Sequence, residues 1–395
     1  MRTTTYCYPW DLARLGVEPT LRQIADDGFD GIDLAATYHP IDSVSPRDGF
    51  RLFSDGRGAV YFPARAERYG RIKPRIHSSE IAMAWPAAAE HAARTGLTLN
   101  SWTVTLFQPW IRDECPDCAR VLPGGDASGS GVCPANEDVR EFFATLCLDI
   151  VEQFGVDLVR LEGVMPHIFD LDWLRARSLV RMSSLLRMLS NLCFCGSCIA
   201  RGVASGLDVV RIRATVNAAI RAELADDGHS DDRAAALKAD AQLIAFAENQ
   251  VGASIEFVRT IVKRIDGRAR VSMNALTPYR ALMGDERDEG LLSQFIAGCD
   301  QVDLNVLNPA GNRLVAGLNA RLDQPRPLSA LYVTIRNPTV TSAAALAEAG
   351  SATIVKSLQA AADVGVRELS LYNYGLLPDA DVHAFMEAVG QLRIA

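Results

Sequence analysis

Six cysteines of this chain lie in two clusters whose spacing could bind a metal ion. Cys115 and Cys118 form one Cys-x-x-Cys pair, and Cys195 and Cys198 form a second. Two thiolates separated by two residues can both reach one tetrahedral ion, so two such pairs would fill all four positions around zinc. A site closed in this way is usually structural. We therefore predict a structural, thiolate-bound zinc with these four cysteines as ligands.

The other two members of the clusters, Cys133 and Cys193, could each replace a member of either pair. A redox dithiol, two disulfides and cysteines that serve only as small buried residues are the alternatives. The segment that begins at Met1 has no apolar stretch typical of a signal peptide. We expect a cytoplasmic protein, and a reducing compartment favours thiols and bound metal over disulfides.

Polar residues at the ends of β-rich segments indicate a second candidate site. Glu162 stands at the end of the segment 157–163, where a carboxylate could act in catalysis or bind a substrate. Asp303 lies in a similar segment, 301–306, and is a second catalytic candidate. Other polar and aromatic residues near such segments are predicted to bind the substrate: Tyr38, His39, His77, Trp102, His167, Asn274, Asn305, Tyr332, Arg336, Tyr372 and Asn373.

Eight β-rich segments that alternate with helical patterns would position these residues. The β-rich segments are 3–8, 31–36, 98–104, 157–163, 269–274, 301–306, 329–335 and 367–373. The helical patterns between them include 78–95, 137–154, 288–297 and 343–363. This alternation predicts a closed (β/α)8 TIM barrel. An open, doubly wound sheet is the alternative, but no Gly-x-Gly-x-x-Gly turn follows the first strand.

Three long insertions interrupt the predicted barrel, which we expect to form a single domain over residues 1–395. They are 37–77, 105–135 and 164–207, and they follow the second, third and fourth strands. The carboxyl ends of barrel strands carry the active site, so these insertions are predicted to form a cap over it. One Cys-x-x-Cys pair falls in each of the last two insertions, whose strands are neighbours.

The strands alternate between apolar and polar residues, and we expect the polar residues to point into the barrel. These are Asp33, Arg160, Glu162, Asn274, Asp303, Asn305, Tyr332 and Tyr372. So many buried hydrogen-bonding groups are costly unless they pair with one another or bind a ligand. For Arg160, we expect a structural ion pair with Asp33 or Asp303.

Four stretches of the chain resemble a group of bacterial barrel proteins that are described as glycoside-hydrolase-like. They are Leu99-Asn-Ser-Trp-Thr-Val, Cys133-Pro-Ala-Asn-Glu-Asp-Val-Arg140, Gly155-Val-Asp-Leu-Val-Arg-Leu-Glu-Gly163 and Leu192-Cys-Phe-Cys-Gly-Ser-Cys198. The resemblance covers most of residues 1–375, and its more specific parts are the Cys-Pro-Ala-Asn and Cys-Phe-Cys-x-x-Cys elements. It implies a TIM barrel with a carbohydrate-like pocket, and it places Glu162 where barrel glycosidases keep an acid/base carboxylate.

The resemblance does not establish an activity; we predict cleavage of a glycosidic or related C–O or C–N bond, with Glu162 as the general acid. Glycosidases need a second carboxylate about 5 to 9.5 Å away, commonly at the end of strand seven. Here that strand ends in Tyr332-Val-Thr-Ile-Arg336 and offers none. Asp303 is the nearest inward candidate, as a base or as a stabiliser of positive charge, and Asp170 or Asp172 could substitute.

Two other functions remain open. The segment Gly28-Phe-Asp-Gly-Ile-Asp-Leu34 resembles the second strand of sugar-isomerase-like barrels, which bind a divalent cation at successive strand ends. At three of those strand ends this chain has Asn274, Asn305 and Asn373, and neutral amides are poor sole ligands for a catalytic cation. A sugar isomerase or lyase is one alternative, and a non-catalytic carbohydrate-binding protein is the other.

Composition limits the class of partner. The formal net charge is -8, and acidic and basic residues are interspersed, which argues against a nucleic-acid surface. No segment reaches the roughly 18 consecutive apolar residues that a membrane span needs. We expect a small, carbohydrate-containing substrate, no nucleic-acid or membrane partner, and we leave a homo-oligomer open.

Overall fold

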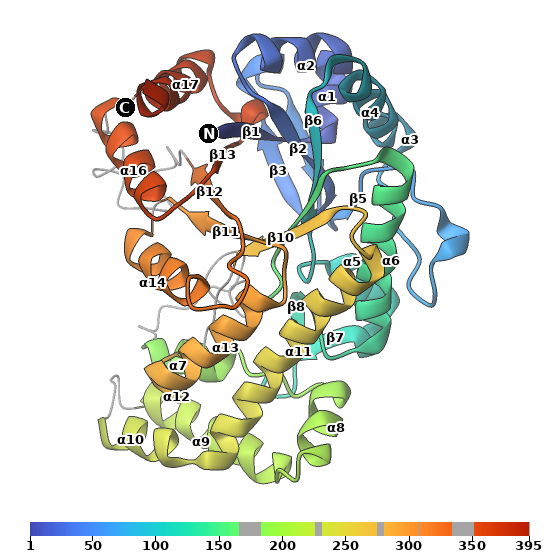
Figure 1. Ribbon diagram of the computed structural model, residues 1–395. Coiled ribbons are helices and arrows are strands. Elements are labelled where there is room, and N and C mark those ends of the chain that lie inside the picture. Colours follow the sequence, from blue (N-terminus) through green and yellow to red (C-terminus); the bar gives the residue numbers. More distant parts are fainter. Residues whose placement is uncertain (166–182, 226–230, 275–279, 307, 334–350, 395) are drawn as a thin grey trace.

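The protein forms a closed barrel of eight parallel strands surrounded by helices (Figure 1). The structure is a computed structural model that describes residues 1–165, 183–225, 231–274, 280–306, 308–333 and 351–394. The strands follow the order β1-β13-β12-β11-β10-β9-β6-β2, and pairing of β1 with β2 closes the barrel. The predicted (β/α)8 barrel is therefore confirmed.

The barrel strands coincide closely with the predicted β-rich segments. They are β1 (Arg2–Cys7), β2 (Gly31–Tyr38), β6 (Thr98–Val104), β9 (Leu158–Glu162), β10 (Arg270–Asn274), β11 (Gln301–Asn305), β12 (Leu328–Val333) and β13 (Glu368–Tyr372). Short strands outside the barrel are β3 (Ile41–Val44), β4 (Leu52–Asp55), β5 (Ala59–Val60), β7 (Ala119–Val121) and β8 (Ala127–Val132).

Helices cover the outside of the barrel. In the first part of the chain they are α1 (Pro9–Leu15), α2 (Val17–Asp26), α3 (Ser79–Ala82), α4 (Ala84–Thr95), α5 (Pro109–Glu114), α6 (Glu137–Phe154), α7 (Ser184–Ser190) and α8 (Gly196–Ala204). They continue with α9 (Val209–Ala225), α10 (Asp231–Ala239), α11 (Ala241–Ile265), α12 (Arg280–Met283), α13 (Asp285–Ala297), α14 (Pro309–Asn319), α16 (Ser351–Asp363) and α17 (Asp379–Ile394).

Local sequence explains where the long helix α6 begins and ends. The side chain of Asn136 accepts a hydrogen bond from the backbone N–H of Val139, which caps the first turn. Glu137 and Asp138 follow, and their negative charge favours the amino end of a helix. Gly155 ends the helix with a φ of 60°, a left-handed conformation that glycine adopts at little cost.

The segments between the barrel strands contain additional structure. In residues 37–77, β3 and β4 form a hairpin, and β5 adds to the end of β2 as a ninth, antiparallel strand. In residues 105–135, β7 and β8 form a second hairpin. The helices α8, α9 and α10 pack on the long helix α11 (Figure 1). No helix within the described ranges is both long and apolar enough to cross a membrane.

Candidate functional site

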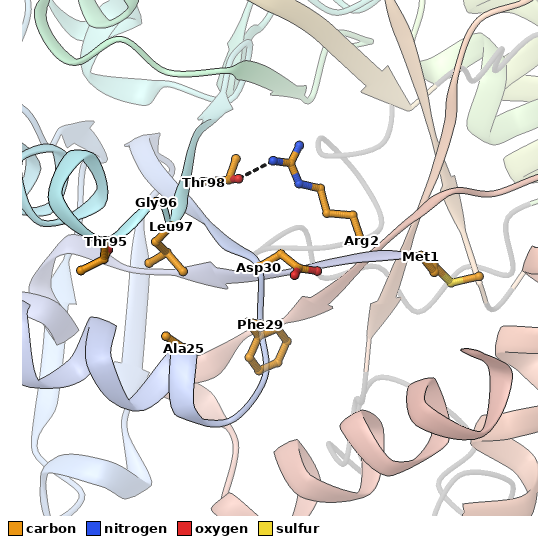
Figure 2. A pocket seen from close by; sticks show the side chains of 9 residues that line it. All are labelled: Met1, Arg2, Ala25, Phe29, Asp30, Thr95, Gly96, Leu97 and Thr98. Carbon is orange, nitrogen blue, oxygen red and sulfur yellow. Dashed lines mark hydrogen bonds between the residues drawn. The ribbon is translucent and has the colours of Figure 1, made fainter. Parts of the chain in front are cut away.

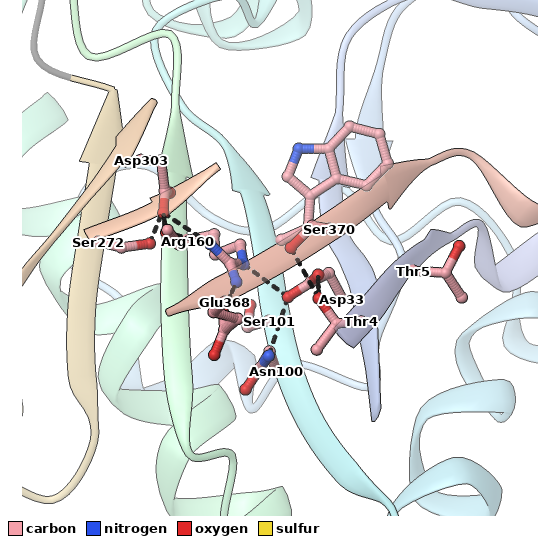
Figure 3. Close-up of polar contacts among 12 residues, drawn as sticks. Thr4, Thr5, Asp33, Asn100, Ser101, Arg160, Ser272, Asp303, Glu368 and Ser370 are labelled. Atoms are coloured by element: carbon pink, nitrogen blue, oxygen red, sulfur yellow. Dashed lines mark hydrogen bonds and ion pairs between the residues drawn. The ribbon is translucent and has the colours of Figure 1, made fainter. Parts of the chain in front are cut away.

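A buried ionic network centred on Arg160 fills the middle of the barrel (Figure 3). The guanidinium donates to Asp33 at 2.7 Å and to Asp303 at 2.6 Å, and it also donates to Glu368. Hydroxyl groups complete the network, because Thr4 donates to Asp33 and Ser272 to Asp303. The predicted structural ion pair of Arg160 is confirmed, and it involves both expected partners.

The network also contains Glu368, which sequence analysis did not select. Its position at the start of β13, in the same alternating phase as Ser370 and Tyr372, is the signal that would have identified it. The network thus holds three carboxylates to one guanidinium. Arg160, Asp33 and Glu368 are buried, and Asp303 is only 9% exposed.

Asp303 is held tightly within this network. One carboxylate oxygen accepts from Arg160 and from the hydroxyl of Ser329, and the other accepts from the hydroxyl of Ser272 at 2.7 Å. In the register of the sheet Asp303 lies opposite Asn274 and Ser329. Asp303 is therefore held in place by partners on three other strands, β9, β10 and β12.

Glu162 lies at the carboxyl end of β9, one alternation beyond Arg160 along the strand. The indole N–H of Trp102, on the neighbouring strand β6, donates to its carboxylate at 2.7 Å. Burial raises the pKa of the Glu162 carboxyl above its usual value, and the hydrogen bond from Trp102 opposes that rise. A carboxyl group with a raised pKa can retain its proton for use as a general acid.

Three tyrosine hydroxyls form a closed ring beside Trp102. The hydroxyl oxygens of Tyr8 and Tyr38 are 3.1 Å apart, those of Tyr8 and Tyr372 are 2.8 Å apart, and those of Tyr38 and Tyr372 are 3.0 Å apart. The ring of Trp102 contacts all three tyrosines, with centroid distances of 4.9 to 5.6 Å. Burial raises the pKa of Tyr372 to about 12 and also raises those of Tyr8 and Tyr38 well above the usual value, so all three are neutral at physiological pH.

Sequence analysis missed Tyr8, although Tyr38, Trp102 and Tyr372 were selected. Tyr8 directly follows β1 and shares the alternating phase of Thr4 and Tyr6, which would have identified it. It extends the site outward, because its ring stacks on Trp10 at 4.1 Å, and Trp10 stacks on Phe53 of β4 at 4.1 Å. The hairpin of β3 and β4 is thereby attached to the aromatic wall of the site.

The two predicted histidines in the described ranges occupy different parts of this wall. His39 stacks on Tyr38 at 4.2 Å, and burial lowers its pKa to about 4, so it is neutral at physiological pH. His77 packs on Phe53 and Tyr61, further out along the aromatic cluster. Burial lowers the pKa of His77 as well. Neither histidine therefore carries a positive charge at neutral pH.

The predicted asparagines lie at three strand ends. Asn274 ends β10 and is exposed, and Asn305 ends β11 and is partly exposed. Asn373 is buried directly after β13, where its side-chain oxygen accepts from the backbone N–H of Gly375. Asn274 and Asn305 therefore line the mouth of the barrel, whereas Asn373 stabilises the turn that follows β13.

Tyr332 does not face the interior, contrary to the prediction. Ser329, three residues earlier on the same strand, donates to Asp303 inside the barrel. Alternate residues of a strand share a face, so Leu331 also lies on the inner face. Tyr332 consequently points outward, where its ring stacks on Phe385 of α17 at 5.5 Å. The prediction for Tyr332 was wrong because both phases of this strand contain bulky residues, so that alternation alone did not identify the inner face.

Four predicted residues lie outside the described ranges, namely His167, Asp170, Asp172 and Arg336.

Exposure locates the opening of the site. The inward residues Arg160, Ser272, Ser329 and Ser370 are at most 2% exposed. The residues one alternation further along the same strands keep exposed surface: Glu162, Asn274, Leu331 and Tyr372. The candidate site therefore opens at the carboxyl ends of the strands, as active sites of such barrels do.

A separate cavity of about 710 Å³ lies at the opposite end of the barrel (Figure 2). It is lined by residues at the starts of β1 and β6 and at the end of α2, including Arg2, Asp30 and Thr98. The side chain of Arg2 donates to the hydroxyl of Thr98. The amino ends of barrel strands serve stability, and this cavity is remote from Glu162 along the strands.

Four buried thiols form a compact cluster outside the barrel. They belong to Cys133, Cys193, Cys195 and Cys198, and their sulfur atoms all lie within 4.8 Å of one another. The sulfur of Cys133 is 3.5 Å from that of Cys198 and 4.0 Å from that of Cys193. Cys195 caps the amino end of α8, where the helix dipole favours negative charge. These four residues could bind a metal ion.

The cluster contains only one of the two predicted Cys-x-x-Cys pairs. Cys195 and Cys198 are joined by Cys133 and Cys193 in the places predicted for Cys115 and Cys118. Cys118 instead donates to the side-chain oxygen of Asn136 at 3.6 Å, and burial raises its pKa to about 12. It is thus a neutral thiol at physiological pH. All nine cysteines are unbridged.

Another group of potential metal ligands is Asp117, Cys118 and Asp138. Both carboxylates accept hydrogen bonds from the guanidinium of Arg71, at 2.5 to 2.9 Å. The guanidinium of Arg71 therefore already occupies both carboxylates. Among the described residues, groups of three or more such ligands are confined to these two clusters, and Glu162 is in neither.

Similarity to known proteins is confined to solved structures. No family model and no curated protein match the chain. The catalytic domain of a β-amylase from Paenibacillus polymyxa is 10% identical, with a TM-score of 0.59, over 99% of this chain and 98% of that one. An α-L-fucosidase isoenzyme 2 from Paenibacillus thiaminolyticus is 13% identical, with a TM-score of 0.53. That match covers all of this chain and 49% of the fucosidase, about half its length. At these identities the likeness shows the fold.

Proposed function

We propose that this protein hydrolyses a glycosidic or related C–O or C–N bond in a small carbohydrate-containing substrate. The observation that carries the proposal is the environment of Glu162: a carboxyl at the mouth of the barrel, with a raised pKa, beside an indole donor and neutral tyrosines. Aromatic rings and hydroxyls together are suited to sugar rings, which have apolar faces and polar edges. The fucosidase and the β-amylase domain that share this fold are glycosidases, which is consistent with the proposal.

In the proposed reaction Glu162 is the general acid. It gives its proton to the leaving-group oxygen or nitrogen as the bond to the anomeric carbon breaks, and a water molecule then bonds to that carbon and returns a proton to Glu162. Trp102 holds the carboxylate in one orientation before and after the transfer. The desolvated surroundings that raise the pKa of Glu162 are also those that make its proton available at neutral pH.

We assign Asp303 an electrostatic role. Its oxygens accept from Arg160, Ser272 and Ser329, so the carboxylate is oriented within the network and does not need to move. A fixed negative charge beneath the site would stabilise the positive charge that develops at the anomeric carbon. In this assignment Asp303 acts through its charge, without taking up a proton.

Replacement of the acid tests the proposal. We expect Glu162→Gln to lower the rate of hydrolysis of a panel of disaccharides and methyl glycosides, whose leaving groups need a proton, by about 10²- to 10⁴-fold, while sugar binding persists. Glu90→Gln is the matched control, because Glu90 is exposed on α4 and pairs only with Arg94 in its own helix. Hydrolysis by the Glu162→Gln variant at the wild-type rate would contradict the assignment.

A stability measurement on the same variant is independent of activity. The folded protein raises the pKa of Glu162, so ionisation destabilises the wild type as the pH rises above the usual value of about 4.3. Glu162→Gln has no such charge. We expect its melting temperature to exceed that of the wild type at pH 8 and to match it at pH 4.

We further propose that the thiol cluster binds one structural zinc ion. In a tetrahedral site with Zn–S bonds of about 2.3 Å, neighbouring sulfurs are about 3.8 Å apart. The sulfur separations of 3.5 and 4.0 Å bracket that value. The side-chain amide of Gln250 on α11 accepts from the backbone N–H of Cys193 and donates to its carbonyl, both at 3.0 Å, which holds one proposed ligand in place.

Elemental analysis distinguishes the four proposed ligands from the other pair. We expect about one zinc per chain in the wild type and in Cys115→Ser, and much less in Cys133→Ser and Cys193→Ser. Cys133 and Cys115 are both buried, which makes them a matched pair. Zinc content that falls in Cys115→Ser and persists in Cys133→Ser would refute this ligand set.

A further inference from the structure

The ring of tyrosine hydroxyls has a hydrogen-bonding capacity that can be counted. Tyr8, Tyr38 and Tyr372 have three O–H groups and three short oxygen–oxygen contacts. If each hydroxyl donates to the next, every contact is satisfied, and each oxygen has donated once and accepted once. A hydroxyl oxygen can accept twice. The closed ring therefore retains lone pairs that could accept hydrogen bonds from a ligand.

The ring is accessible from the mouth of the barrel through one of its members. Tyr8 and Tyr38 are buried, at 0% and 3% exposure, whereas Tyr372 is partly exposed at the end of β13. Glu162, which is also partly exposed, lies close enough that its charge acts on the hydroxyls of both Tyr38 and Tyr372. A ligand at the Tyr372 hydroxyl would thus lie next to the proposed acid.

Electrostatics beneath the ring favour the same kind of ligand. The network below holds Asp33, Asp303 and Glu368 against the single guanidinium of Arg160 (Figure 3). Burial raises the pKa of the nearby Tyr6, and the charges of the network act on it as well: Arg160 lowers this pKa, and Asp33 and Asp303 raise it. Excess negative charge in a desolvated interior repels an anion and attracts a cation.

We propose that the Tyr8–Tyr38–Tyr372 ring, together with Trp102 and Glu162, is a binding subsite for a neutral or amino-bearing sugar ring, and that it rejects sugars that carry a carboxylate or phosphate. This proposal rests on the proposed function for the identity of the site, and it adds the class of substrate. Hydroxyl and ammonium groups are the donors that the ring accepts, and neither is repelled by the network.

Saturation-transfer NMR with free monosaccharides tests the choice of class in the wild-type protein. The probes are glucose, galactose, mannose and glucosamine, compared with glucuronate and glucose 6-phosphate. We expect at least one neutral or amino sugar to bind, with saturation arriving from aromatic protons, and the charged analogues to bind at least about tenfold more weakly. Binding of none of the neutral or amino sugars, or equal binding of an anionic analogue, would overturn the proposal.

Three variants test the ring itself. We expect Tyr8→Phe, Tyr38→Phe and Tyr372→Phe each to weaken binding of the best probe by about three- to tenfold, because each removes one hydroxyl from the ring. Tyr69→Phe is the control, since it removes a buried hydroxyl that donates to Asp149 outside the barrel. Folded ring variants that bind as tightly as the wild type would overturn the assignment. If a variant does not fold, the wild-type comparison still decides the class.

The two proposals fail separately. Selective binding of neutral sugars without hydrolysis of any glycoside would refute the proposed function and leave the subsite intact. Hydrolysis that depends on Glu162 but is unaffected in folded ring variants would refute the subsite and leave the function intact.

Discussion

Glu162 accepts a hydrogen bond from a neighbouring strand, and that bond opposes the effect of burial on the pKa of its carboxyl. The donor is the indole of Trp102, at 2.7 Å. A hydrogen bond to a carboxylate favours the charged form and lowers the pKa, whereas burial favours the neutral form. At the scale of the residue, the chemistry of the site thus depends on the balance between these two effects.

Trp102→Phe removes the hydrogen bond and retains an aromatic ring. We expect the pKa of Glu162 to rise further, so that the alkaline limb of the pH–rate profile, where the acid loses its proton, moves to higher pH. A carbon-13 NMR titration of Glu162 measures the same shift without activity. Trp85→Phe is the control, because that indole donates to the backbone oxygen of Ala35. An unchanged pKa in Trp102→Phe would exclude this role of the indole.

At the scale of elements, the barrel depends on close approach of strand backbones. Gly31, the first residue of β2, lies against Thr98 of β6, so a Cβ atom at Gly31 would be 2.6 Å from the backbone oxygen of Thr98. The backbone of a strand in a closed sheet cannot move aside without breaking the hydrogen bonds to its neighbouring strands. The position therefore requires glycine for packing.

A matched pair of glycine substitutions measures this requirement. We expect Gly31→Ala to lower the free energy of unfolding by about 1–3 kcal/mol, or to prevent folding, because the added methyl group forces the two strands apart. Gly317 lies within α14 and has no atom within 4 Å of its would-be Cβ, so Gly317→Ala should increase stability by up to about 1 kcal/mol. Denaturant unfolding of both variants gives the comparison. Equal changes in the free energy of unfolding in the two variants would show that β2 and β6 have room to separate.

At the scale of the whole molecule, Arg160 connects strands that are far apart in the sequence. Its partners Asp33, Asp303 and Glu368 come from β2, β11 and β13, so one side chain on β9 links four of the eight barrel strands. A buried charge cluster of this kind contributes less than its contacts suggest, because desolvation offsets the attraction. Loss of its only cation, however, leaves uncompensated carboxylates in the interior.

We therefore expect Arg160→Met to destabilise the protein by about 3–5 kcal/mol, measured by chemical denaturation. Arg22→Met is the control, because Arg22 forms an exposed pair with Glu18 on α2, and exposed pairs contribute about 0.2–1 kcal/mol. A loss of unfolding free energy as small as that in Arg22→Met would contradict the role of Arg160 in compensating the buried carboxylates.

The sequence by itself determined the barrel and the position of the candidate acid. Strand and helix periodicities are local properties, and they predicted all eight barrel strands, with Glu162 at a strand end and Arg160 one alternation before it. The Cys-x-x-Cys element at Cys195 and Cys198 could also be recognised from the sequence, because two residues three positions apart on one turn share a local geometry.

Only the tertiary structure decided which distant residues meet. Cys133, which is in no Cys-x-x-Cys pair, joins the thiol cluster because the turn after β8 brings it to the amino end of α8. A register shift in β2 between Ala35 and Thr37 reverses the alternation, which turns Tyr38 toward Tyr372. Such contacts depend on bulges, register and loop paths, which are set by the packing of the whole chain and leave no local periodicity to read.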